Sequence, residues 1–148
     1  MDTRDDPMAM WRDLVGGFML AFGDIELISI RLWRLYLAGP FPIHFKERTG
    51  RVLCELRRHG PEHDRLVALL EQSMKLADKR NTIAHHPMQV QVFQHSTTGE
   101  VLFEQAIASE TGDDYIDDAE LTELRAEAED LVSRLFMILG YIDPRDRR

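Results

Sequence analysis

Residues 66–92 read LVALLEQSMKLADKRNTIAHHPMQVQV, and the spacing of their apolar side chains changes at Pro87. Before the proline, one helical face collects residues at three- and four-residue steps: Leu66, Leu69, Leu70, Ser73, Leu76, Ala77 and Arg80. After the proline, apolar residues alternate with glutamines, as in a strand: Met88, Val90 and Val92. The stretch therefore predicts a helix that begins near Pro61, because proline suits a helix start, and that ends before Pro87, where a strand follows.

Two more helices are predicted upstream of this stretch. The first covers residues 7–37 and is ended by the glycine- and proline-rich residues 39–42. Its apolar stripe consists of Val15, Phe18, Met19, Phe22, Ser29, Trp33 and Leu37. Glu26 falls on the same stripe, where an acid is unexpected. A shorter helix fits residues 43–58 and stops before Gly60.

The remainder of the chain predicts a β-hairpin and a last helix. Residues 88–107 form the hairpin, because two alternating segments flank residues 95–99, which have the composition of a turn. A lone hairpin is only marginally stable, so it must lean on the helices or pair with another chain. We expect an acidic loop at residues 113–118, a helix over residues 119–139 and a frayed tail at residues 143–148.

These elements place the chain in the mainly α class. Four helices with short links predict an up-and-down four-helix bundle, with the hairpin inserted between the third and the last helix. The 148 residues fit a single domain over residues 1–148. Cys54, the only cysteine, is expected in the core and allows no internal disulfide. Because the N-terminus is acidic and no apolar run reaches the ~20 residues of a membrane span, we expect a cytoplasmic protein without membrane contact.

The charge of the chain is distributed unevenly. A formal net charge of −8 argues against a nucleic-acid partner. Residues 41–80 nonetheless contain nine Lys or Arg against six Asp or Glu, whereas residues 96–132 contain twelve acids and a single arginine. The basic segment holds five candidate contacts to RNA phosphates: Lys46, Arg48, Arg51, Arg57 and Arg58. Because Glu47 and Glu55 are interleaved with them, an ordinary solvated helix face is the alternative.

The predicted helix before Pro87 carries the residues that are best suited to chemistry. Asn81 and His85 are four residues apart and therefore share one helix face. Arg80 lies on the buried stripe of this helix, where a cation needs a partner. Glu26 is the matching acid on the stripe of the first helix, so we expect Glu26 and Arg80 to face each other.

The segment RNTIAH, from Arg80 to His85, resembles the Arg-x-x-x-x-His motif of the HEPN superfamily (higher eukaryotes and prokaryotes nucleotide-binding domain), in which Asn frequently follows the arginine. Domains of that family are compact helical bundles with the motif near a helix end, and the hairpin is not part of their minimal pattern. Many are metal-independent endoribonucleases, often toxins or defence proteins, that dimerise so that two motifs line one groove. The resemblance implies RNA cleavage by Arg80 and His85 with Asn81 in support, a homodimer, and a cognate antitoxin if the protein is a toxin.

The residue types themselves fit this chemistry. Attack of a ribose 2′-hydroxyl on its phosphate needs an acid and a base, and His85 can serve as either near neutral pH. The Arg80 guanidinium can stabilise the developing phosphoryl charge without a metal or another cofactor. The alternative is a non-catalytic module of the same fold for dimerisation, interaction or nucleotide binding, in which Arg80 is a structural ion-pair partner and His85 stabilises the helix end. A metal site is disfavoured, because Gly60 and Pro61 interrupt the histidine pair at helical spacing, His59 and His63.

Overall fold

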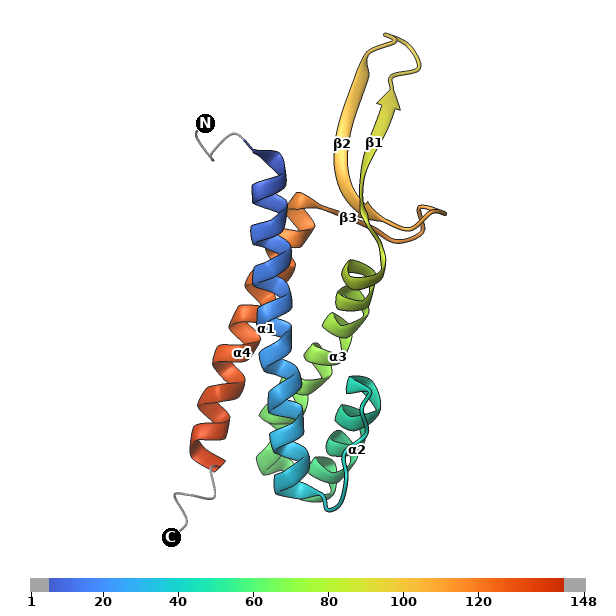
Figure 1. Cartoon of the computed structure of the whole chain (residues 1–148). Coiled ribbons are helices and arrows are strands. Elements are labelled where there is room, and N and C mark those ends of the chain that lie inside the picture. The colour runs from blue at the N-terminus through green and yellow to red at the C-terminus, as the bar shows by residue number, and fades with distance from the viewer. Residues whose placement is uncertain (1–5, 143–148) are drawn as a thin grey trace.

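The computed structural model describes residues 6–142, which form a mainly helical structure with a small antiparallel sheet (Figure 1). In chain order the elements are α1 (Pro7–Tyr36), α2 (Phe45–Arg58), the short 3-10 helix η2 (Pro61–His63), α3 (Asp64–His85), β1 (Met88–Gln94), β2 (Val101–Ala108), β3 (Tyr115–Asp117) and α4 (Asp118–Ile142). The predicted mainly α class is therefore confirmed. Within residues 6–142, no helix combines the length and the apolar character that crossing a membrane requires. The tail that was expected to fray, residues 143–148, lies outside the described residues.

Local signals explain where the helices begin and end. α1 begins at Pro7 because the Asp6 carboxylate caps it, accepting a hydrogen bond from the Met8 N–H at 2.9 Å. The chain turns away after α1 at Gly39, whose φ of 83° is a conformation that glycine adopts without strain. A second glycine of this kind, Gly60 with φ 99°, separates α2 from η2. The predicted third helix therefore begins as one turn of η2 and continues as α3.

α1 is the central element of the helical part. It packs mainly against α4 and α2, and it also touches α3. Because three helices surround it, α1 is buried on more of its circumference than a single stripe, and Ile25, Ile28 and Leu32 outside the predicted stripe are buried. On α4 the core side chains are Leu121, Leu124, Ala128, Leu131, Leu135 and Leu139. Cys54 was expected in this core but is exposed, because Leu53 and Leu56 already fill the inward face of α2.

The sheet has the order β1-β2-β3 and is antiparallel throughout. The two alternating segments predicted within residues 88–107 do form paired strands, with Met88 opposite Ile107. The expectation of a loop over residues 113–118 is wrong for residues 115–117, which form β3. Residues 115–117 pair with the C-terminal part of β2, on the side opposite β1. The sequence of these three residues contains no pattern that predicts this pairing.

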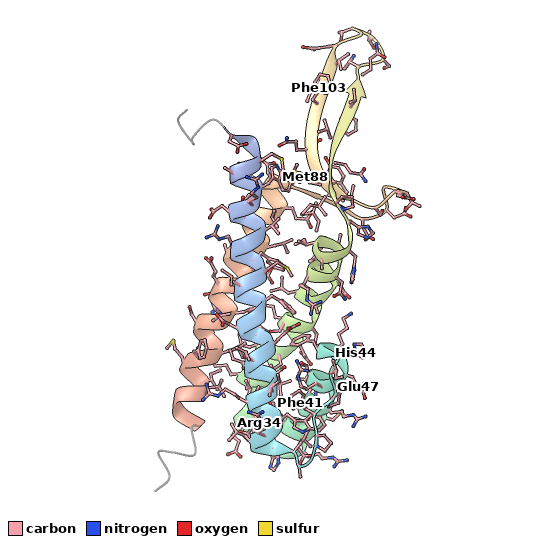
Figure 2. All side chains as sticks on the ribbon, viewed as in Figure 1. Arg34, Phe41, His44, Glu47, Met88 and Phe103 are labelled. Carbon is pink, nitrogen blue, oxygen red and sulfur yellow. The ribbon has the colours of Figure 1, made fainter. Side chains whose placement is uncertain are left out.

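The two ends of the β1–β2 pair have different environments. At its base, Ala106, Ile107 and Ala108 are buried. There the Trp11 indole N–H donates to Gln105 Oε1 at 3.0 Å, which ties α1 to β2. Toward the turn the strands extend beyond the helices, and Figure 2 shows Phe103 near this free end. The sheet is therefore anchored at one end only.

Candidate functional site

Arg80 lies where α3 faces α1, and its guanidinium has contacts on several sides. Its Nη2 forms an ion pair with Glu26 on α1, which confirms the pairing expected from the sequence. Its Cζ lies 5.3 Å from the ring centroid of Phe22, one turn before Glu26, in a cation–π arrangement. The side chains of Arg80 and Glu26 are 27% and 33% exposed, so the pair is half-buried and still open to solvent on one side.

Asn81 connects this pair with the end of α3. Arg80 Nη1 donates to Asn81 Oδ1 at 3.1 Å, and Asn81 itself is exposed. On an ideal helix, Arg80 and His85 are separated by ~7.5 Å along the axis and by ~140° around it. Asn81 lies one turn before His85 and on nearly the same face. The helix therefore places the Asn81 amide between the guanidinium and the imidazole.

His85 is the last residue of α3 and is exposed. It borders a pocket of about 420 Å³ between the end of α3 and the loop that follows β2. The other lining residues are His86, Pro87, Gln89, Ala108, Ser109, Glu110 and Thr111. Ser109 shapes this loop, because its Oγ accepts the Asp114 N–H at 3.1 Å. None of the described side chains hydrogen-bonds to the His85 imidazole, which is exposed and borders the pocket.

The structure brings together three of the four predicted central residues. Glu26, Arg80 and Asn81 form a chain of contacts across α1 and α3. His85 lies outside this chain, and Arg80 is not among the lining residues of its pocket. A substrate that touches both must therefore extend along the Asn81 side of α3. Ser109 and Thr111 of the pocket had no sequence signal, because only folding brings their loop to α3.

Arg48, predicted as an RNA contact, lies in the interior with only 3% of its surface exposed. Its Nε donates to Ser29 Oγ on α1 at 2.8 Å. Its Nη1 donates to the carbonyls of Pro42, at 2.8 Å, and Ile43, at 3.0 Å. Burial lowers the pKa of Arg48, and the nearby Glu26 carboxylate opposes this shift. Arg48 therefore holds the α1–α2 connection in place, and its prediction as an RNA contact is corrected, because helical position rather than charge decides which α2 side chains point inward.

The four other basic candidates on α2 remain at the surface, and each has an acidic neighbour. The ion pairs are Lys46–Asp78, Arg51–Glu47 (2.7 Å), Arg57–Glu71 and Arg58–Glu55 (3.8 Å). Exposed pairs of this kind contribute little stability, but they reduce the positive potential that a phosphate backbone would meet. Their arrangement favours the solvated helix face over a basic RNA-binding surface.

A second group of titratable rings lies at the other end of α3. The ring centroids of His59 and His63 are 6.0 Å apart, and Tyr36 is 5.8 Å from the first and 5.5 Å from the second. His59 Nε2 lies 3.3 Å from Glu55 Oε1. Within the described part of the chain, no three His, Cys, Asp or Glu side chains are grouped so that they could hold a metal ion.

Comparisons with known proteins add no assignment to this site. No protein-family model, curated protein sequence or solved structure matches the chain. Its function must therefore be inferred from Arg80, Asn81 and His85 and from the contacts around them.

Proposed function

We propose that the chain is a HEPN-like endoribonuclease that cleaves RNA without a metal ion. The observation that carries this proposal is the exposed imidazole of His85 at the end of α3, one turn from the bonded Arg80–Asn81 pair. The pocket beside His85, about 420 Å³, is in the size range of small-ligand sites and could accept a nucleotide. We also propose that the helices form the up-and-down four-helix bundle of that superfamily. The protein would act as a toxin or in defence, in the cytoplasm.

The proposed reaction is an internal transesterification. His85, as a base, takes the proton of a ribose 2′-hydroxyl, and the 2′-oxygen forms a bond to the adjacent phosphorus. The bond from phosphorus to the 5′-oxygen of the next nucleotide breaks, and this oxygen takes a proton from water. The products are a 2′,3′-cyclic phosphate and a 5′-hydroxyl. If His85 is instead the acid, it protonates the leaving 5′-oxygen while water takes the first proton.

Arg80 is proposed to stabilise the phosphoryl oxygens as their charge develops. A guanidinium has five N–H donors, and the bonds to Glu26 and Asn81 leave the others available. The ion pair and the Phe22 ring hold the guanidinium in one orientation, which reduces the entropy lost when a phosphate binds. Glu26 is therefore a positioning residue in this proposal, and Asn81 orients the phosphate or the imidazole.

RNA is the proposed substrate, and a second copy of the chain is the proposed partner. For a toxin, a cognate antitoxin would be a further partner. The acidic residues 96–132, which include β2, β3 and the first part of α4, repel RNA, so we expect RNA to reach the pocket from the α3 side. The mildly basic residues 41–80 offer the more favourable approach to the end of α3.

One set of observations favours the non-catalytic module as a second candidate. Arg80 already has an acidic partner in Glu26, as a purely structural arginine would. The four surface cations on α2 are paired, and the chain carries a net charge of −8. In this alternative, Arg80 joins α1 to α3, and the pocket at His85 binds a nucleotide or a partner without cleaving it.

The decisive experiment incubates the purified protein with structured and unstructured RNAs in EDTA. Parent protein is compared with His85→Ala, Arg80→Lys and the control His59→Ala, whose histidine lies at the opposite end of α3. We expect His85→Ala to lose cleavage by ~100-fold or more, as for a missing acid or base. Arg80→Lys keeps the charge beside Glu26 but loses the bidentate fork, so a loss of the same order is expected.

The control and the product ends decide between the two candidates. His59→Ala should cleave at the parental rate, and the products should carry 2′,3′-cyclic phosphates. Equal cleavage by the parent and His85→Ala would refute the assignment of His85. A folded parent that binds nucleotide but leaves every RNA intact would favour the non-catalytic module.

A further inference from the structure

The free end of the β1–β2 pair exposes an extensive apolar surface. Six large apolar side chains on these strands are exposed: Val90, Val92, Phe93, Val101, Leu102 and Phe103. Their exposed fractions lie between 48% and 69%. Figure 2 shows Phe103 on the part of the sheet that extends beyond the helices, and its side chain is 69% exposed. Beyond its anchored base, this part of the sheet consists of two strands only, so a partner would stabilise it.

The outer edge of β1 is suited to pairing with another strand. β1 is the edge strand of the sheet, and no other described strand pairs with its outer side. Natural proteins protect such edges with charged residues, lysine in particular, or with proline, which has no backbone N–H to donate. The β1 sequence, MQVQVFQ, contains no charge and no proline. A strand could therefore add to this edge through main-chain hydrogen bonds.

The charge of the chain restricts where a second copy could approach. Each chain carries a net charge of −8, so two copies repel each other over most of their surfaces. Residues 88–99 contain no Asp, Glu, Lys or Arg. The β1 edge and its turn therefore form an uncharged surface on which two copies can approach without direct charge repulsion.

The exposed apolar side chains support an interaction at this end of the sheet. At the exposed fractions given above, the six leave on the order of 600 Å² uncovered in each chain. Pairing at the β1 edge would cover chiefly the flanks of Val90, Val92 and Phe93, because the other three lie one strand further in, on β2. The same surface continues into a cleft of about 500 Å³ between α1 and the sheet, lined in part by Met10, Trp11 and Val90. An apolar patch of this size on a soluble chain marks an interaction surface.

We propose that two copies associate through β1, in an antiparallel pair centred on position 91. The two copies would be related by a two-fold axis perpendicular to the sheet. Directly opposite residues of antiparallel strands point to the same face, and side chains alternate along each strand. The axis must therefore lie midway between a residue and its own equivalent in the partner subunit. Position 91 is the midpoint of β1, so it gives the longest overlap. This register places Val90 opposite Val92 of the partner subunit, and the two sheets become one of six strands.

This inference specifies the surface of the homodimer proposed above, and it has a consequence for the site. In the proposed register, Met88 lies ~20 Å, or six residue steps, from the equivalent position of the partner along the strands. His85 precedes Met88, so the two imidazoles are further apart still. Each copy then works with its own Arg80 and His85, rather than in one groove shared by two motifs.

The first test measures the self-association of the full chain by sedimentation equilibrium. Val92→Lys adds a charge to the β1 edge without changing the buried core. Leu27→Lys is the matched control, because Leu27 is a 60% exposed leucine on α1, away from the sheet. We expect the parent to dimerise, Val92→Lys to raise the dimer Kd on the order of 100-fold, and Leu27→Lys to leave it unchanged. Circular dichroism establishes that both variants are folded.

The second test reads the register directly. In a Cys54→Ser background, Gln91→Cys should oxidise to a covalent dimer, because position 91 faces its own equivalent across the axis. Gln89→Cys should not, since its equivalent is ~13 Å away along the strands, beyond disulfide reach. A parent that remains monomeric at on the order of 100 μM, or cross-linking that is equal at both positions, would overturn the proposal.

The two proposals fail separately. Val92→Lys should retain RNA cleavage per chain if each copy has a complete site. An intact dimer that never cleaves RNA contradicts the ribonuclease alone. Cleavage by a protein whose association is insensitive to Val92→Lys contradicts the β1 interface alone.

Discussion

The surroundings of Arg80 and the free end of the β1–β2 pair differ in how many contacts their side chains make within the chain. Around Arg80 the chain supplies its own partners, with Glu26 as the counter-ion and the Phe22 ring beneath the guanidinium. Phe22 in turn packs edge-on against Phe45 at 5.1 Å. On the strands, Phe103 is 69% exposed and has no such enclosure. The first region is complete within one chain, whereas the second leaves apolar side chains exposed, and for it we have proposed a partner.

The largest expected effect compares one residue type in the two regions. Phe22 is 1% exposed and Phe103 is 69% exposed. Phe22→Ala removes a buried ring and leaves a cavity, so we expect it to lower the free energy of unfolding by ~3–5 kcal/mol. Phe103→Ala in the dilute protein should change it by no more than ~0.5 kcal/mol. Urea unfolding measures both, and equal losses would show that the strands are packed within a single chain.

Protein concentration sharpens this contrast. If the strands are covered by a second copy, the unfolding midpoint of the parent rises with protein concentration, because association stabilises only the folded state. Val92→Ala should weaken that dependence, because Val92 lies on the pairing strand, and Phe22→Ala should preserve it. Midpoints independent of concentration in the parent would remove the reason for treating the free end as an interface.

Arg48→Met tests how far the helical region depends on its buried polar contacts. The variant leaves Ser29 Oγ and the carbonyl of Pro42 without their donor. We expect a loss of ~2–4 kcal/mol in the free energy of unfolding, as for buried groups that lose a charged partner. Arg51→Met is the control, because Arg51 forms only an exposed pair with Glu47, and it should change stability by less than ~0.5 kcal/mol. Similar values for the two variants would contradict the structural role of Arg48.

Glu26→Gln gives a smaller effect in the same region. It removes the counter-ion of Arg80 but keeps the size of the side chain. Because both side chains are about one third exposed, water screens the lost attraction, and we expect a loss of ~1 kcal/mol. Denaturant unfolding of Glu26→Gln beside Glu47→Gln, whose pair is more exposed, measures the difference. A loss of unfolding free energy as large as that of Arg48→Met would mean that the ion pair of Arg80 and Glu26 is shielded from water.

An effect that appears only at alkaline pH is expected at the junction between the two regions, where β3 joins the sheet to α4. Burial, together with nearby carboxylates such as Glu104, raises the pKa of Tyr115 to about 12. In the unfolded chain the phenol ionises near pH ~10. The folded state therefore keeps the phenol protonated to a higher pH than the unfolded chain does. The contribution of Tyr115 to stability is fully present below pH ~10 and is lost as the pH rises through about 12. The phenolate absorbance of the parent minus that of Tyr115→Phe measures this pKa, and a value near 10 would show that the junction is open to water.

Much of the fold could be predicted because its signals are local. The change of period at Pro87 sets the boundary between α3 and β1, and the turn at residues 95–99 separates β1 from β2. The pairing of Glu26 with Arg80 was also predictable, since each is a charged side chain on an otherwise apolar stripe, and such a charge needs a partner. These inferences needed only the spacing and the chemistry of neighbouring residues.

Other features were decided by long-range packing, and the sequence predictions for them were wrong or absent. Arg48 carries the same charge as Arg51, yet it is buried because its position on α2 faces Ser29. β3 forms because the edge of β2 is available beside it, not because of its own three residues.

The amino-acid sequence by itself determined the helices, the alternating strands and the Arg80–His85 spacing, because these follow from backbone periodicity and local chemistry. Only the tertiary structure decided which cations are buried, which loop borders His85 and which apolar side chains remain uncovered. The physical reason is that burial depends on elements far apart in the chain coming together. A residue's type fixes its preference for water, but its neighbours in space decide whether that preference is met.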